Sequence, residues 1–270
     1  MLIYERISLV VSFTLLGLVV YFLIQLPNRA IELMLLGSPL TLVVSERWLM
    51  ALLLGGLVAT GTSTITHVYP RLPRWVSGYS LTFWLLPALL IILVVLLIPL
   101  FAFSLPWWVV AIATTGTLLW FTILAEYHTI DPRDRWYGLS HFWLNIVGYG
   151  VAFGFFVVIY QTRARGLLSA TGVLLVSGLL ALPLLRAGPD KAGRTWLFAT
   201  VTALVVGQST WALNYWRTPP LTAAFWLLLI FYLFVGMAQQ HLLGRLTRRA
   251  LIEFATVTLV GLLTILWFAP

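Results

Sequence analysis

The 270-residue sequence contains no cysteine and only one lysine, Lys191. The lack of cysteine excludes disulfides, thiolate metal sites, haem attached through thioethers and cysteine nucleophiles. A retinal-binding protein needs a lysine within a helix for its Schiff base, and Lys191 lies in a predicted loop. The absence of cysteine and the single lysine therefore exclude several classes of function before any motif is considered.

Charge is also scarce. Only 9% of the residues are charged and 61% are hydrophobic, whereas an average soluble domain has roughly 25% charged and 45–50% apolar residues. A soluble domain of this size could not bury so much apolar surface. A bilayer can accommodate it, because a helix of roughly 20 apolar residues crosses the hydrocarbon core with its backbone polar groups satisfied internally. The composition therefore predicts an integral membrane protein.

The formal net charge of +8 does not indicate nucleic-acid binding. The sixteen basic residues are spread through short segments between apolar runs and form no dense stripe. Basic residues beside membrane spans set topology and contact anionic headgroups. We expect the bilayer to be the partner of these charges, with no nucleic acid bound.

Apolar runs bounded by charges, Pro and Gly predict an all-α bundle of about nine transmembrane helices in a single integral membrane domain. The predicted helices cover residues 7–26, 48–67, 79–101, 107–127, 139–160, 167–185, 195–215, 221–241 and 249–268. The first is too long for the apolar core of a signal peptide, so we expect it to be retained. Residues 30–45 contain a Gly-Ser-Pro turn between two β-favouring arms, which predicts a small external β-hairpin between the first two helices.

The third predicted helix is the most apolar. No charge or side-chain amide occurs from Leu85 to Phe103, and Pro87 and Pro99 are both tolerable in a membrane helix. Because it is apolar around its whole circumference, we expect this helix to face lipid.

The distribution of Lys and Arg predicts the orientation, since cytoplasmic segments hold the excess of these residues. With the N-terminus inside, the inner segments hold eleven basic residues and the outer segments five, which together account for all sixteen. The sequence therefore predicts a cell-membrane protein, of the inner membrane where two exist, with a cytoplasmic N-terminus and an external C-terminus.

Polar side chains within membrane helices are costly and so mark candidate sites. With this topology, several of them lie near the cytoplasmic ends of their helices, and we expect them to form a cytoplasm-facing polar pocket. The pocket candidates are His67, Glu126, His128, His141, Asn145, His241 and Glu253. Imidazole and carboxylate groups in such a pocket could bind a metal or haem, relay protons or hold a headgroup. The alternative is that each of them reaches the interface by itself.

Helical spacing groups some of these candidates into stripes. One stripe comprises Gly56, Thr60, Ser63 and His67, and another comprises His141, Asn145 and Tyr149. A polar face is more stable against another such face than against lipid tails, so we expect both stripes to point into the bundle. This predicts that the second, fourth and fifth helices converge around His67, Glu126 and His141. We also expect Glu253 to be buried and to face His241, because an unpaired buried carboxylate is costly.

Three further segments are rich in polar residues. Residues 126–137 contain three of the eight acidic residues, which is typical of either a catalytic loop or a connector with local Asp–Arg pairs. Residues 208–216 combine amides with Trp and Tyr, which suits either a ligand contact or a membrane interface. The eighth helix ends in Gln239-Gln240-His241.

Three functional hypotheses remain open. The first is a non-catalytic membrane protein, either a transporter-like bundle or an accessory subunit of a membrane complex, which could bind other subunits or a hydrophobic ligand. The second is a membrane enzyme acting on a lipid or isoprenoid, with Glu126, His128 and His141 as acid–base groups. The third is a subunit that holds haem or chlorophyll through histidines. The first is favoured because few charged groups capable of chemistry are present, and the residues identify no particular cofactor.

Overall fold

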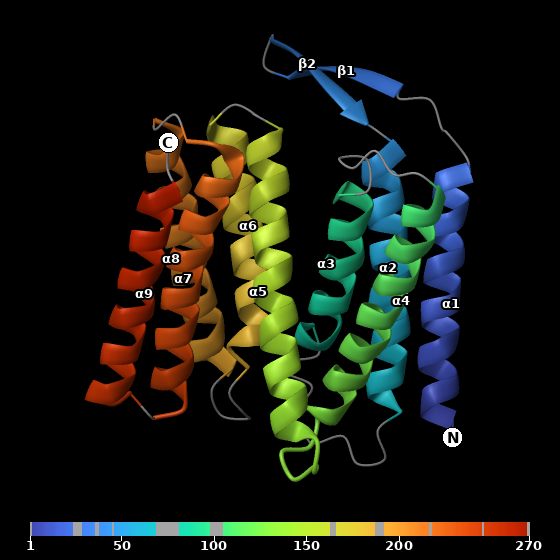
Figure 1. Cartoon of the computed structure of the whole chain (residues 1–270). Coiled ribbons are helices and arrows are strands. Elements are labelled where there is room, and N and C mark those ends of the chain that lie inside the picture. Colours follow the sequence, from blue (N-terminus) through green and yellow to red (C-terminus); the bar gives the residue numbers. More distant parts are fainter. Residues whose placement is uncertain are drawn as a thin grey trace. The chain divides into compact units, whose positions relative to one another are not determined.

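The computed structural model describes residues 2–23, 29–35, 38–44, 46–68, 81–97, 105–162, 166–186, 192–215, 218–244 and 246–268. Nine α-helices lie within these ranges (Figure 1). They are α1 (Leu2–Leu23), α2 (Glu46–His67), α3 (Thr82–Leu97), α4 (Leu105–His128), α5 (Tyr137–Gln161), α6 (Gly166–Leu184), α7 (Ala192–Asn214), α8 (Pro220–Leu242) and α9 (Arg248–Phe268). Each overlaps one of the nine segments predicted as helical.

Seven of the described helices are long and apolar enough to cross a membrane. They are α1, α2 and α4 to α8, whereas the apolar parts of α3 and α9 are shorter. Pro219 and Pro220 begin α8, where a missing backbone N–H costs nothing because the first helical N–H groups have no intrahelical acceptor. The helical bundle and its several apolar spans are compatible with a membrane protein.

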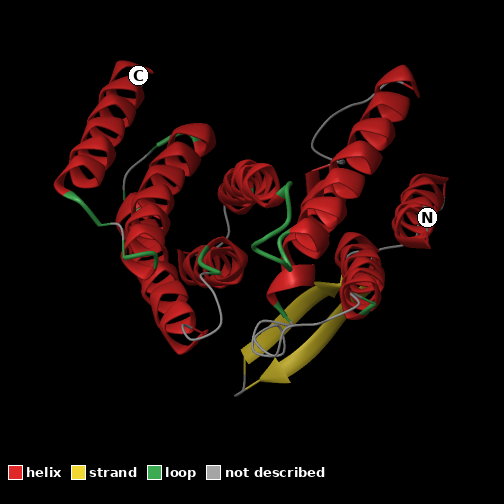
Figure 2. Cartoon of the chain, turned by 90° about the horizontal axis from the view of Figure 1, so that it is seen from below, coloured by secondary structure: helices red, strands yellow, loops and turns green. Residues whose placement is uncertain are grey.

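Two strands lie between α1 and α2. Strand β1 (Arg29–Leu35) pairs antiparallel with β2 (Ser38–Val44), and the register runs from Arg29 opposite Val44 to Leu35 opposite Ser38. Figure 2 shows the two paired strands in yellow. An external position for this segment stays a prediction.

The third helix is buried, so the expectation that it faces lipid is wrong. Phe83, Leu86, Ile91 and Val95 have no exposed surface, and most of the other described side chains of α3 are also buried. A helix that is apolar on all sides is compatible with lipid and equally with a protein interior. Composition alone therefore could not distinguish the two positions.

The helices fall into two compact units. Unit 1 comprises Met1–Tyr69 and Pro87–Tyr127, and unit 2 comprises Pro70–Leu86 and His128–Pro270. The expectation of a single membrane domain stays a prediction.

In unit 1, α2 packs closely on α1. Gly61 faces Val10, and a Cβ atom placed on Gly61 would lie 2.6 and 2.8 Å from the two Val10 methyl groups. The side of α2 that packs inward is formed by Ala51, Leu54, Gly55, Val58, Thr62, Ile65 and Thr66. The close approach of these helices therefore requires a residue without a side chain at position 61.

The predicted polar stripe of α2 lies elsewhere. Gly56, Thr60 and His67 are exposed and Ser63 is partly exposed. Thr60 donates its hydroxyl hydrogen to the Gly56 carbonyl oxygen at 2.9 Å, so it needs no partner on another helix. The expectation that this stripe points inward is wrong within unit 1.

Unit 2 is organised around α8, which packs on α5, α7 and α9. The helix α6 packs on both α5 and α7. Asn214 of α7 donates to the Ser169 hydroxyl of α6 at 3.1 Å, and Tyr160 of α5 donates to the Thr210 carbonyl of α7 at 3.4 Å. These side-chain hydrogen bonds join the helices where α5 ends and α6 begins.

Candidate functional site

The sequence-predicted site residues are divided between the two units. His67 and Glu126 belong to unit 1, whereas His128, His141, Asn145, His241 and Glu253 belong to unit 2. Glu126 is completely buried near the end of α4, and His67 is exposed at the end of α2. A common pocket for His67, Glu126 and His141 stays a prediction.

His128 begins a tightly structured connection between α4 and α5. Its Nδ1 atom lies 2.7 Å from a carboxylate oxygen of Asp134. The other Asp134 oxygen accepts a hydrogen bond from the Trp136 backbone N–H at 3.0 Å. Burial alone would raise the pKa of Asp134, but the hydrogen bonds from His128 and Trp136 and the nearby imidazole charge outweigh it and lower this pKa below its usual range.

A second aspartate organises the first half of the same connection. Asp131 precedes Pro132, its carboxylate accepts the Arg133 N–H at 2.9 Å, and its carbonyl accepts the Asp134 N–H at 3.0 Å. Aspartate followed by proline is the preferred start of such a turn. Both carboxylates are thus used by backbone turns, which supports the connector interpretation of residues 126–137.

Arg186 holds this connection from the end of α6. Its guanidinium donates to the Thr129 hydroxyl at 2.8 Å, and its Cζ atom lies 4.0 Å from the centre of the Phe83 ring. A guanidinium over an aromatic face gains electrostatic stabilisation. No local pattern indicates this role of Arg186, because Phe83, Thr129 and Arg186 are far apart in the chain.

Three helices of unit 2 meet in a hydrogen-bond network, which we call the amide network. The Asn145 amide of α5 donates to Nδ1 of His141 at 2.9 Å, and its oxygen accepts from Gln239 of α8 at 3.0 Å. Gln239 also donates to the Leu184 carbonyl at 2.7 Å, the last residue of α6. Since an amide nitrogen can only donate, Nδ1 of His141 is the acceptor in this hydrogen bond.

The amide network brings together His141 and Asn145 as their spacing predicted, but it omits two other candidates. His241 is exposed and its ring packs edge-on against Phe198 at 5.4 Å between ring centres. Glu253 is exposed, so the expectation that it is buried is wrong. It stands near the start of α9, next to Phe254, whose ring lies close to Gly236 of α8. Gln239 was recognised only as part of a polar helix end.

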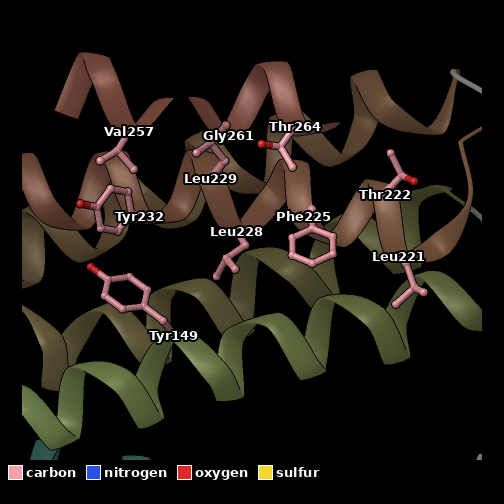
Figure 3. A pocket seen from close by; sticks show the side chains of 10 residues that line it. All are labelled: Tyr149, Leu221, Thr222, Phe225, Leu228, Leu229, Tyr232, Val257, Gly261 and Thr264. Atoms are coloured by element: carbon pink, nitrogen blue, oxygen red, sulfur yellow. The ribbon is translucent and has the colours of Figure 1, made fainter. Parts of the chain in front are cut away.

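A cleft of about 710 Å³ lies between α8 and α9 and extends to α5 (Figure 3). Apolar and aromatic side chains dominate its lining. The lining residues are Tyr149, Leu221, Thr222, Phe225, Leu228, Leu229, Tyr232, Val257, Gly261 and Thr264. We call it the α8–α9 cleft.

Two tyrosines mark one end of the α8–α9 cleft. The ring centres of Tyr149 and Tyr232 lie 5.6 Å apart, and Figure 3 shows both hydroxyl groups at this end, with Leu221 and Thr222 at the other. Among the described residues, neither hydroxyl has a hydrogen-bond partner. Tyr149 continues the predicted stripe of His141 and Asn145, so the stripe leads from the amide network to the cleft.

The described residues contain no group of three or more His, Cys, Asp or Glu side chains that could hold a metal ion. Comparison with known proteins gives a family model that matches residues 26–268 and is described as "Protein of unknown function (DUF5656)". No curated protein and no solved structure matches the chain.

Proposed function

We propose that this chain, which belongs to the DUF5656 family, is a multi-pass membrane protein that binds a lipid chain. The description of the family assigns no function, so the proposal is argued from the α8–α9 cleft. The role is one of binding without catalysis. The observation that carries the proposal is an apolar cleft formed by α5, α8 and α9, of which α5 and α8 are long and apolar enough to cross a membrane. Two phenol hydroxyls at one end of it have no hydrogen-bond partner among the described residues.

The dimensions of the cleft support a chain-shaped ligand. Leu221 and Tyr232 are eleven positions apart on α8, which corresponds to roughly 16 Å along the helix. Half of a hydrocarbon core is roughly 15 Å thick. Tyr149 and Tyr232 lie near the middle of α5 and α8. The cleft thus extends from a helix end to about the depth of the bilayer midplane, which fits a lipid chain from one leaflet.

The two hydroxyls support a ligand that carries a polar group. A phenol in an apolar environment usually finds a hydrogen-bond partner, since an unpaired one loses stabilisation. A neutral oxygen-bearing group, such as a hydroxyl or carbonyl, could accept hydrogen bonds from both tyrosines. The surrounding aliphatic and aromatic side chains would bury the hydrocarbon part of the ligand.

The binding test compares two probes, a lysophospholipid and a polyprenol, titrated onto delipidated protein and followed by native mass spectrometry. Leu228→Trp should fill the cleft and greatly reduce retention of the chain that binds there. Tyr232→Phe should weaken binding roughly fivefold, because one hydrogen bond is lost.

The matched control is Leu175→Trp, which adds the same ring to α6 at a position that is 62% exposed and outside the cleft. If the Leu228→Trp variant binds both probes as tightly as the Leu175→Trp variant does, the cleft is excluded as the binding site.

We further propose that all nine helices cross the cell membrane, with the N-terminus cytoplasmic and the C-terminus external. The Lys and Arg distribution supports this orientation. Single cysteines can test it because the natural chain has none. Gly138 and Gln161 are both exposed and lie at opposite ends of α5. An impermeant thiol reagent applied outside should label Gln161→Cys and spare Gly138→Cys, and the reverse pattern would contradict the orientation.

A further inference from the structure

Unit 2 has an exposed glutamine that lacks a hydrogen-bond partner among the described residues. Gln208 of α7 is exposed, and none of the described residues hydrogen-bonds to its carboxamide. Exposed threonines nearby form hydrogen bonds within their own helices. Thr200 donates to the Trp196 carbonyl at 2.9 Å, and Thr171 donates to the Leu167 carbonyl at 2.9 Å. Gln208 therefore differs from its polar neighbours.

The depth of Gln208 makes the unpaired amide costly. It lies five positions beyond Ala203, the middle residue of α7, and so roughly 8 Å along the helix axis from the midplane. The hydrocarbon core extends roughly 15 Å on either side of that plane. An amide at this depth loses several kcal/mol if it has no hydrogen-bond partner.

The surface around Gln208 has the shape of a helix-docking site. A groove of about 410 Å³ runs between α6 and α7 and is lined by Ala170, Thr171, Leu174 and Gly207 as well as by Gln208 and Trp211. No side chain of position 207 fills the groove, because Gly207 has none. The helices α6 and α7 approach closely here, since a Cβ atom on Gly207 would lie 2.9 Å from the Leu174 Cβ atom. Trp211, which is 51% exposed, stands beside the groove as a large projecting side chain.

We propose that this face binds a second copy of the chain, with Gln208 of one copy hydrogen-bonded to Gln208 of the other. An amide presents one donor group and one acceptor group, so its polarity is complementary to that of an identical amide across a two-fold axis. Two copies inserted in the same orientation share an axis along the membrane normal. Because Trp211 lines the same groove one turn from Gln208, this symmetry brings Trp211 of each copy into the contact as well.

The proposal rests on α7 crossing the membrane, as in the proposed function, and is independent of any ligand in the α8–α9 cleft. Its test measures association of the full chain in liposomes, by energy transfer between two dye-labelled populations over a range of protein-to-lipid ratios. Gln208→Leu should weaken dimerisation roughly tenfold. Gln161→Leu makes the same change at the exposed end of α5 and should have no effect.

Cysteine cross-linking provides a second measurement that does not depend on changing Gln208. Leu204 lies one turn before Gln208 and is 46% exposed, whereas Ile146 of α5 is 50% exposed. Oxidation should give disulfide-linked dimers of Leu204→Cys and not of Ile146→Cys. Purified protein that is monomeric at every ratio, a dimer unaffected by Gln208→Leu, or equal cross-linking at both positions would overturn the proposal. If the protein inserts correctly into the membrane but is monomeric, the contact between two Gln208 side chains is refuted and the proposed function is not affected.

Discussion

Gln239→Leu should lower the free energy of unfolding by about 2–4 kcal/mol, because two acceptors in unit 2 lose their donor. These acceptors are the Asn145 side-chain oxygen and the Leu184 carbonyl at the end of α6. Leucine preserves much of the volume but cannot donate. The measurement is the thermal midpoint of the full chain in detergent, which should fall by roughly 5–10 °C.

The neighbouring residue supplies the control for this experiment. Gln240 follows Gln239 on α8, is also partly exposed, and has no hydrogen bond to the described residues. Gln240→Leu should leave the midpoint nearly unchanged. Gln239→Glu should be as harmful as Gln239→Leu at neutral pH, because an ionised carboxylate is acceptor-only. Equal midpoints for all three variants and the natural chain would show that the amide network contributes no stability.

Gly61→Leu should disrupt the packing of α1 on α2 in unit 1 and cost about 3 kcal/mol. The new side chain would overlap Val10, whose β-branched side chain has little freedom to rotate away. Loss of the closely packed pair should appear as a lower thermal midpoint and faster proteolysis in unit 1.

Gly56→Leu makes the same change on the same helix, where a Cβ atom meets nothing within 4 Å. It should be neutral or slightly stabilising, since leucine is a better helix former than glycine. A similar loss of stability in both variants would mean that the effect of Gly61→Leu comes from the helix itself and not from its contact with α1.

The positions of the helices were predictable because the information is local. A run of apolar residues that ends at a charge or a proline specifies a helix without reference to any other part of the chain. The spacing of His141 and Asn145 was sufficient for the same reason, since residues four apart share a helix face and here form a hydrogen bond. Local patterns therefore located the elements and half of the amide network.

The inward faces of the helices were not predictable, because lipid and protein interior are both apolar. The stripe that includes Gly56 and Thr60 suggested an inward face, but a threonine hydroxyl can bond to its own helix and needs no polar neighbour. Gly61, which makes the close contact, carries no polarity to reveal it. Glu253 lies near a helix end, where a long charged side chain reaches water. Polarity was therefore a poor guide to burial.

Gln239 escaped recognition because its partners are distant in sequence. It is 94 residues from Asn145 and 55 residues from Leu184. No period or motif links such positions, and an adjacent glutamine of identical chemistry makes neither contact. The α8–α9 cleft was hidden for the same reason, since it is assembled from three helices whose lining residues are ordinary apolar side chains with a few hydroxyls.

The end of α6 has a consequence for how the protein is synthesised. The last carbonyl of α6 is bound by Gln239, and the next carbonyl, that of Leu185, is bound by Thr195 at 3.3 Å. The ribosome adds roughly 5–20 residues per second, so the 55 residues that separate Leu184 from Gln239 take roughly 3–11 s to make. During this interval the Leu184 carbonyl must be hydrated or held by a transient partner. The C-terminal end of α6 is completed only when the end of α8 has left the ribosome, and unit 2 therefore closes late in biogenesis.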